Sequence, residues 1–166
     1  DNKDIKASKL RIKEWDYYFM GNAEFGLSLT IADNSYMGLA SAQVFDFVKG
    51  KKVTNFAFVP FSMGKMQLPS SSEQGSVSYH SKKITLDFMN EGGKRKLYCN
   101  MPNFDKGEQL IVEVELTDMP QDTMVIATPF KKDKKAFYYN QKINCMQVTG
   151  YMLYGEKRYC LNNLLA

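Results

Sequence analysis

The chain has 166 residues, of which 44% are apolar and 24% charged, and these proportions exclude a disordered or fibrous protein. This length fits one domain, in which folding buries roughly 70% of the surface that the unfolded chain exposes. The 22 basic and 18 acidic residues give a net charge of +4. Because both signs are interspersed along the chain, we expect no nucleic-acid partner.

Cysteine and histidine usage argues against metal and nucleophilic chemistry. Cys99, Cys145 and Cys160 show no metal-ligand spacing and predict reduced thiols that pack as small hydrophobes in a cytoplasmic protein. His80 is the only histidine, so we expect neither a zinc site nor a catalytic triad, and no metal or cofactor. No stretch approaches the roughly 18 apolar residues of a membrane helix, so we expect no membrane span.

The first predicted strand, RIKEWDYY, places charge on both of its faces. Side chains alternate along a strand, so the two faces carry Arg11, Lys13, Trp15 and Tyr17 on one side and Ile12, Glu14, Asp16 and Tyr18 on the other. Neither set is an ordinary core face, and this makes the segment the first candidate for a functional site.

Period-two alternation continues through the rest of the chain and predicts about ten to twelve strands. The clearest has Leu110, Val112, Val114 and Leu116 on one face and acidic residues on the other. Turn residues separate the further strands, which we expect around residues 25–31, 37–47, 53–59, 84–88, 94–101, 123–130, 136–142 and 143–154.

The spacing of these strands predicts an all-β fold formed by residues 1–166 as a single domain. Short turns favour an up-and-down antiparallel barrel over a Greek-key sandwich. Residues 60–76 are the least regular stretch, which suggests either a lid or a mobile crossing. The final RYCLNNLLA stops on an apolar run, which suggests docking against a following segment.

RIKEWDYY, FGLSLTIADNSYMGLASAQVFDF and AFYYNQKINCMQVTGYM together resemble a bacterial family known as domain of unknown function 2804. The resemblance spans most of the chain and implies that it is the N-terminal half of a longer protein, because an LDWGRG-like motif expected to follow is absent. It further implies a remote similarity to lipocalin-like (calycin) proteins, including carotenoid hydratases. We therefore expect an antiparallel lipocalin-like (calycin-like) barrel or a strongly curved sheet. The C-terminal half of the longer protein is an expected partner.

Two carboxylates on one strand face are the first candidate for chemistry. The Cα atoms of Glu14 and Asp16 lie roughly 6.5 Å apart if the segment is extended, so each could raise the pKa of the other. The alternative is that they pair with neighbouring Arg or Lys side chains. Trp15, the only tryptophan, either lines a ligand pocket or closes the end of the core.

AFYYNQK repeats this mixture of aromatic and polar residues. Tyr138, Asn140 and Lys142 share one face and could donate to a carboxylate of a ligand, of Glu14 or of Asp16. A cross-strand salt bridge is the structural alternative. If the barrel closes, we expect this segment to lie beside RIKEWDYY.

The leading function is a binding module for a small hydrophobic or amphipathic molecule. The alternatives are an enzyme, namely a hydratase, isomerase or cyclase with Glu14 or Asp16 as proton donor, and a structural scaffold. The predicted ligand-binding residues are Glu14, Trp15, Asp16, Tyr18, Asp33, Tyr36, Tyr139 and Lys142.

Overall fold

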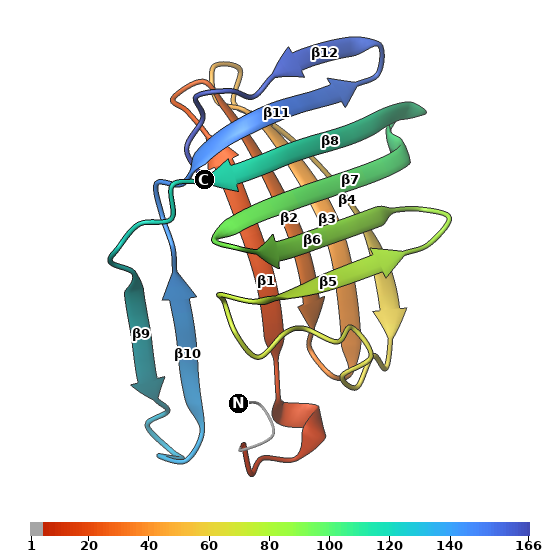
Figure 1. The fold of residues 1–166 in the computed structure, drawn as a ribbon. Coiled ribbons are helices and arrows are strands. Elements are labelled where there is room, and N and C mark those ends of the chain that lie inside the picture. The colour runs from red at the N-terminus through yellow and green to blue at the C-terminus, as the bar shows by residue number, and fades with distance from the viewer. Residues whose placement is uncertain (1–4) are drawn as a thin grey trace.

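The computed structural model describes residues 5–166, which form one short 3-10 helix and twelve antiparallel strands (Figure 1). The 3-10 helix is η2 (Lys9–Arg11), and no α-helix occurs in this range. The strands are β1 (Glu14–Gly21), β2 (Phe25–Asp33), β3 (Met37–Asp46), β4 (Lys51–Pro60), β5 (Gly75–His80), β6 (Thr85–Glu91), β7 (Lys94–Asp105), β8 (Glu108–Thr117), β9 (Met124–Pro129), β10 (Phe137–Lys142), β11 (Gln147–Tyr154) and β12 (Lys157–Cys160).

The first four strands form a meander in the order β1-β2-β3-β4. Its inner face carries fully buried apolar residues such as Leu27, Leu29 and Ile31, as alternation predicts. Ser35 and Gly50 adopt positive φ angles of 68° and 62° in the turns that connect β2 to β3 and β3 to β4, a conformation that tight turns require.

A second sheet has the order β12-β11-β8-β7-β6-β5. β9 and β10 leave it between β8 and β11 as a separate two-stranded hairpin. The predicted inner face of β8 is confirmed, since Leu110, Val112, Val114 and Leu116 are all buried.

The two sheets pack face to face with their strands crossing, as Figure 1 shows, and the core lies between them. The C-terminal apolar run contributes to this core through Leu161 and Leu164. Leu165 bridges Gly21 of β1 and Gln147 of β11, so it connects the two sheets at one corner. The C-terminal segment RYCLNNLLA, for which we expected docking against a following segment, therefore packs against the two sheets described here.

The all-β antiparallel prediction is confirmed, but the sheets do not close into a barrel. A closed barrel needs every strand paired on both sides, whereas β4 and β5 are edge strands that pair only with β3 and β6. The reason is the connection formed by residues 61–74, which crosses from one sheet to the other in place of a hairpin turn.

The cysteines behave differently from one another. Cys99 is fully buried, and burial raises the pKa of its thiol. Cys145 and Cys160 are free and exposed, so the prediction that all three pack as small hydrophobes is wrong for these two. His80 is exposed and its Nε2 lies 2.6 Å from the carboxylate of Asp87.

Candidate functional site

β1 is an edge strand whose two faces have different environments. Its outward face carries Trp15, Tyr17 and Phe19, which are all exposed. Its inward face carries Asp16 and Tyr18, with Glu14 at the start of the strand. The predicted division of RIKEWDYY into two mixed faces is therefore confirmed from Glu14 onward.

On the inward face, Asp16, Tyr18 and Arg95 form a polar cluster at the rim of the core. The Tyr18 hydroxyl donates to the Asp16 carboxylate at 3.2 Å and accepts from the Arg95 guanidinium at 2.9 Å. Arg95, from β7, is only 5% exposed and also donates to the backbone carbonyl of Ser72 at 2.7 Å. A charge this deeply buried needs such partners.

The electrostatics of this polar cluster shift two pKa values. Burial raises the pKa of the Asp16 carboxyl above 3.8, against the opposing effects of the Arg95 charge and the Tyr18 hydrogen bond. Burial likewise raises the pKa of Tyr18, and the neighbouring Asp16 charge adds to this shift. Asp16 is thus the carboxyl group in this cluster that is biased toward its protonated form.

Two buried side-chain atoms in or beside the polar cluster lack a hydrogen-bond partner within residues 5–166, namely Nε of Arg95 and Oδ1 of the neighbouring Asn90. Asn90 lies opposite Arg95 on β6, and its amide also donates to the Ser72 carbonyl, at 2.5 Å. The sequence analysis missed Arg95. Alternate residues of a strand share a face. Because Arg95 lies two residues before Leu97 and four before Cys99, which are both buried, this spacing indicates that Arg95 also points inward.

The outer surface of the four-stranded sheet carries an aromatic face, which we define as Trp15, Tyr17 and Phe19 on β1 with Phe56 and Phe58 on β4. These five side chains are 38–53% exposed. Exposed apolar area of this density usually marks a contact surface in a soluble protein.

The register places three small residues, Thr30, Ser41 and Ala32, and the larger Leu39 between these two aromatic edges. Tyr17 and Phe56 are joined across the sheet by Thr30 and Ser41, and the next row runs from Trp15 through Ala32 and Leu39 to Phe58. Ser41 and Ala32 are buried although they are small, so the larger side chains beside them cover this floor. With strands about 4.8 Å apart, the edges stand roughly 14 Å from each other.

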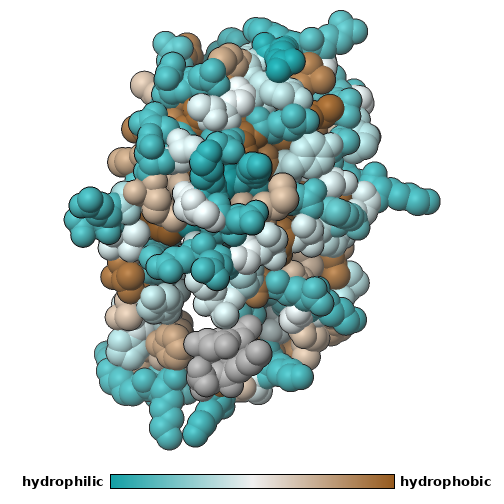
Figure 2. Space-filling model, in the orientation of Figure 1, coloured by the Kyte–Doolittle hydropathy of each residue, from teal (hydrophilic) through white to brown (hydrophobic). Residues whose placement is uncertain are grey.

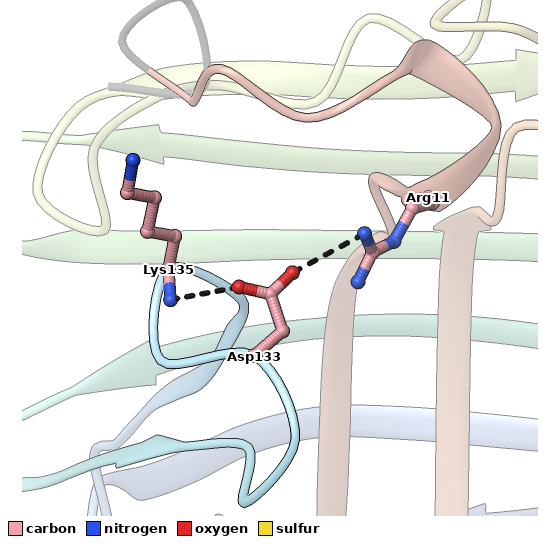
Figure 3. Close-up of polar contacts among 3 residues, drawn as sticks. All are labelled: Arg11, Asp133 and Lys135. Carbon is pink, nitrogen blue, oxygen red and sulfur yellow. Dashed lines mark hydrogen bonds and ion pairs between the residues drawn. The ribbon is translucent and has the colours of Figure 1, made fainter.

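The β9–β10 hairpin contacts β1, the connection between the two sheets and η2. Trp15 stacks on Tyr138 with ring centroids 5.8 Å apart, and the Ser72 hydroxyl donates to Gln141 at 2.8 Å. Figure 3 shows the third contact, in which Arg11 approaches the Asp133 carboxylate at 3.4 Å. Both of its partners are exposed, so this ion pair stabilises little. The expected proximity of RIKEWDYY and AFYYNQK is confirmed, although by hairpin docking and not by barrel closure.

The other predicted residues on the hairpin do not join the polar cluster. Tyr139 and Lys142 are exposed, and the cation that acts on Asp16 is Arg95 and not Lys142. Tyr138 accepts a hydrogen bond from the Asn140 amide at 2.8 Å on the same face, as alternation predicted.

Asp33 holds the connection between the sheets. Its carboxylate accepts from the Ser62 hydroxyl at 2.7 Å and from the backbone N–H of Gly64 at 2.8 Å. Partial burial opposes ionisation, but these bonds and others from Ser35 and Met66 hold the pKa of Asp33 below 3.8. The loop needs such an anchor because Phe61, Met63 and Gln67 have positive φ angles.

Tyr36, which was predicted together with Asp33 to bind a ligand, lies exposed in the turn between β2 and β3. The ammonium of Lys13 stands 4.3 Å above its ring, a cation–π contact. The structure thus separates the two residues by role, with Asp33 binding the loop and Tyr36 facing outward.

Two depressions on the surface of the protein are open to solvent. One has about 460 Å³ and is lined by Tyr151, Arg158 and Cys160. The other has about 570 Å³ and lies beside the β4 edge. Within residues 5–166, no group of three or more His, Cys, Asp or Glu is placed to hold a metal ion.

The fold and the site together define an all-β protein of two crossed antiparallel meanders with an exposed aromatic face. The chain belongs to the family described as Domain of unknown function (DUF2804), which it matches over residues 1–165, so the resemblance seen in the sequence is confirmed. No curated protein and no solved structure matches the chain. In the described part of the chain, no helix is both long and apolar enough to cross a membrane.

Proposed function

We propose that the protein is a binding module for a small hydrophobic or amphipathic molecule, which lies on the aromatic face. The observation that carries this proposal is the row of rings on each edge strand, with side chains that carry no ring, chiefly Thr30, Ser41 and Ala32, between them. Ligand sites combine aromatic surface with a few polar groups, and Thr30 and Ser41 supply polar groups between the rings. The predicted cytoplasmic setting and the lipocalin-like relationship remain part of this proposal.

The opposite surface of the molecule supports this choice by contrast. The outer face of the six-stranded sheet, toward the viewer in Figures 1 and 2, is covered largely by hydrophilic side chains. Lys94 and Glu115 form an ion pair there at 3.2 Å. The two outer faces are therefore not equivalent, and the aromatic one is the face whose burial would release water from apolar surface.

An unpaired hydroxyl lies in the floor of the aromatic face. Ser28, opposite Phe19 on β2, is buried, and its Oγ has no hydrogen-bond partner within the described residues. A buried hydroxyl without a partner costs free energy. A ligand with a polar group is therefore favoured over a pure hydrocarbon.

The only tryptophan reports directly on this face, so the test is a fluorescence titration of Trp15 with decanol below its solubility limit. We expect a saturable change in emission, and weaker binding in Phe56→Ser. Phe130→Ser is the matched control, because Phe130 is equally exposed but lies at the hairpin end. Absence of saturable binding, or equal affinity in both variants, would contradict the proposal and favour the scaffold alternative.

A second candidate, acid–base catalysis on an apolar substrate, is favoured by the raised pKa of Asp16 in the polar cluster. Asp16 would donate the proton, with Tyr18 and Arg95 positioning its carboxyl group. Titration of the Asp16 side-chain carbon by NMR tests this candidate, and an ordinary carboxyl pKa would remove it.

A further inference from the structure

The pocket beside the β4 edge is basic and adjoins the aromatic face. Its lining includes three lysines, Lys82 and Lys83 from the turn between β5 and β6 and Lys106 from the turn between β7 and β8. Asp105 is the one carboxylate in the lining, and it accepts a hydrogen bond from the Tyr154 hydroxyl at 2.8 Å. The pocket therefore carries a net positive charge.

The three lysines of the pocket are not engaged in ion pairs within the described residues. By contrast, Lys94 on the outer face of the six-stranded sheet is paired with Glu115. Like charges brought together attract an anion, and the attraction weakens with salt.

The wall of this pocket is held in place by hydrogen bonds. The Asn55 amide donates to the backbone carbonyls of Asn103 and Phe104 at 3.0 and 2.9 Å, which ties β4 to the irregular end of β7. The Asn103 side chain accepts from the N–H of Gly107 at 3.0 Å. Such preorganisation reduces the entropic cost of binding a ligand.

A backbone donor also faces the pocket. The N–H of Phe56 donates to Oδ1 of Asn55 at 2.8 Å, so it points away from β3 toward the open edge. Because the N–H groups of alternate residues in a strand point to the same side, the N–H of Thr54 is directed to this edge as well, and Thr54 lines the pocket.

The pocket and the aromatic face meet at Phe56. The ammonium of Lys83 stands 5.4 Å above the centroid of the Phe56 ring, and Thr54 precedes Phe56 on the same outward side of β4. A molecule lying along the rings thus reaches the lysines without leaving the surface.

We propose that the ligand is an anionic amphiphile with a single alkyl chain, whose carboxylate or phosphate group binds between Lys82, Lys83 and Lys106 while its chain lies on the aromatic face. This inference rests on the proposed function and adds the charge of the ligand and the position of its head group. The charge complementarity of the pocket selects the anion, and Phe56 sets the direction of the chain.

The test compares decyl phosphate, decanol and inorganic phosphate by calorimetry, with each amphiphile below its aggregation concentration. We expect decyl phosphate to bind at least about tenfold more tightly than decanol, a difference of about 1.4 kcal/mol. This advantage should disappear at high salt, because the pocket is exposed to solvent.

The variant that isolates the head-group site is Lys82→Gln with Lys106→Gln, because neither side chain lies over the Phe56 ring as Lys83 does. Its matched control, Lys131→Gln with Lys132→Gln, removes the same charge from the exposed turn of the β9–β10 hairpin. We expect the first pair to lower the affinity for decyl phosphate about tenfold while leaving decanol unchanged, and the control pair to change neither. All four lysines are exposed, so both variants should fold, which circular dichroism verifies.

The outcomes separate this inference from the proposed function. Equal affinities for decyl phosphate and decanol, unchanged in both variants, would overturn the anion site and leave the aromatic face in place. Inorganic phosphate binding as tightly as decyl phosphate would overturn the amphiphile in favour of a free anion. No binding of either amphiphile would overturn both proposals.

Discussion

The two faces of β1 show how one strand serves two purposes. Asp16 and Tyr18 on the inward face have partners at short distances, since Arg95 bonds Tyr18 and Tyr18 bonds Asp16. Trp15 and Tyr17 on the outward face remain 39% and 50% exposed. A side chain whose partners are already in place contributes to stability, whereas an exposed ring gains most from a partner that arrives later. Mutations on the two faces should therefore separate stability from binding.

The largest effect on stability is expected from Arg95→Met, because it leaves the Tyr18 hydroxyl and the Ser72 carbonyl without their buried donor and removes the positive charge that acts on Asp16. We expect the free energy of unfolding to fall by about 4 kcal/mol, measured by urea denaturation. Lys96→Met is the control, since Lys96 is the exposed next residue on the same strand. Equal losses in the two variants would show that the polar cluster does not stabilise the fold.

A smaller loss, about 3 kcal/mol, is expected from Asp33→Ala. The substitution removes the acceptor for Ser62 and for the N–H groups of the loop that follows β4. Limited proteolysis should also cut residues 61–67 faster, because their positive φ angles are no longer supported. If the protease cut this loop in Asp33→Ala no faster than in the wild type, the role of Asp33 as an anchor would be refuted.

The pH dependence of stability should carry opposite contributions from the two carboxylates. The pKa of Asp16 is raised, so its contribution is fully present below pH 3.8 and is lost as pH rises through the folded pKa. The pKa of Asp33 is lowered, so its contribution is present above pH 3.8 and is lost as pH falls through the folded pKa.

Denaturation of the wild type and of Asp16→Asn across this pH range tests the first of these signs. The stability of the wild type relative to Asp16→Asn should decrease as pH rises above 3.8. An increase over the same range would mean that Arg95, and not burial, dominates the pKa of Asp16.

The smallest change in stability is expected on the outward face. Tyr17→Ser should alter the free energy of unfolding by no more than about 0.5 kcal/mol, because the Tyr17 ring is half exposed. The same variant should weaken decanol binding severalfold in calorimetry. A stability loss comparable to that of Arg95→Met would break the distinction between the two faces.

Although β5, β12 and the 3-10 helix that includes Arg11 were not predicted, alternation along the chain was sufficient to predict most of the strands, the antiparallel all-β class and the buried face of β8. These follow from sequence because side chains of a strand alternate between two environments, and apolar residues mark the buried one. Residues 136–142 were also correctly predicted as a strand that lies beside β1.

Only the tertiary structure decided which mixed face of β1 points inward. Both faces combine aromatic and polar side chains, so their hydrophobicity does not distinguish them, and the choice depends on Arg95, 77 residues after Tyr18 in the sequence. The open arrangement of the sheets could likewise not be predicted from local sequence patterns. The alternation of apolar and polar residues in β4 and β5 is the same whether these strands pair with each other or remain edge strands. Local periodicity determines which residues share a face, and long-range packing determines what that face meets.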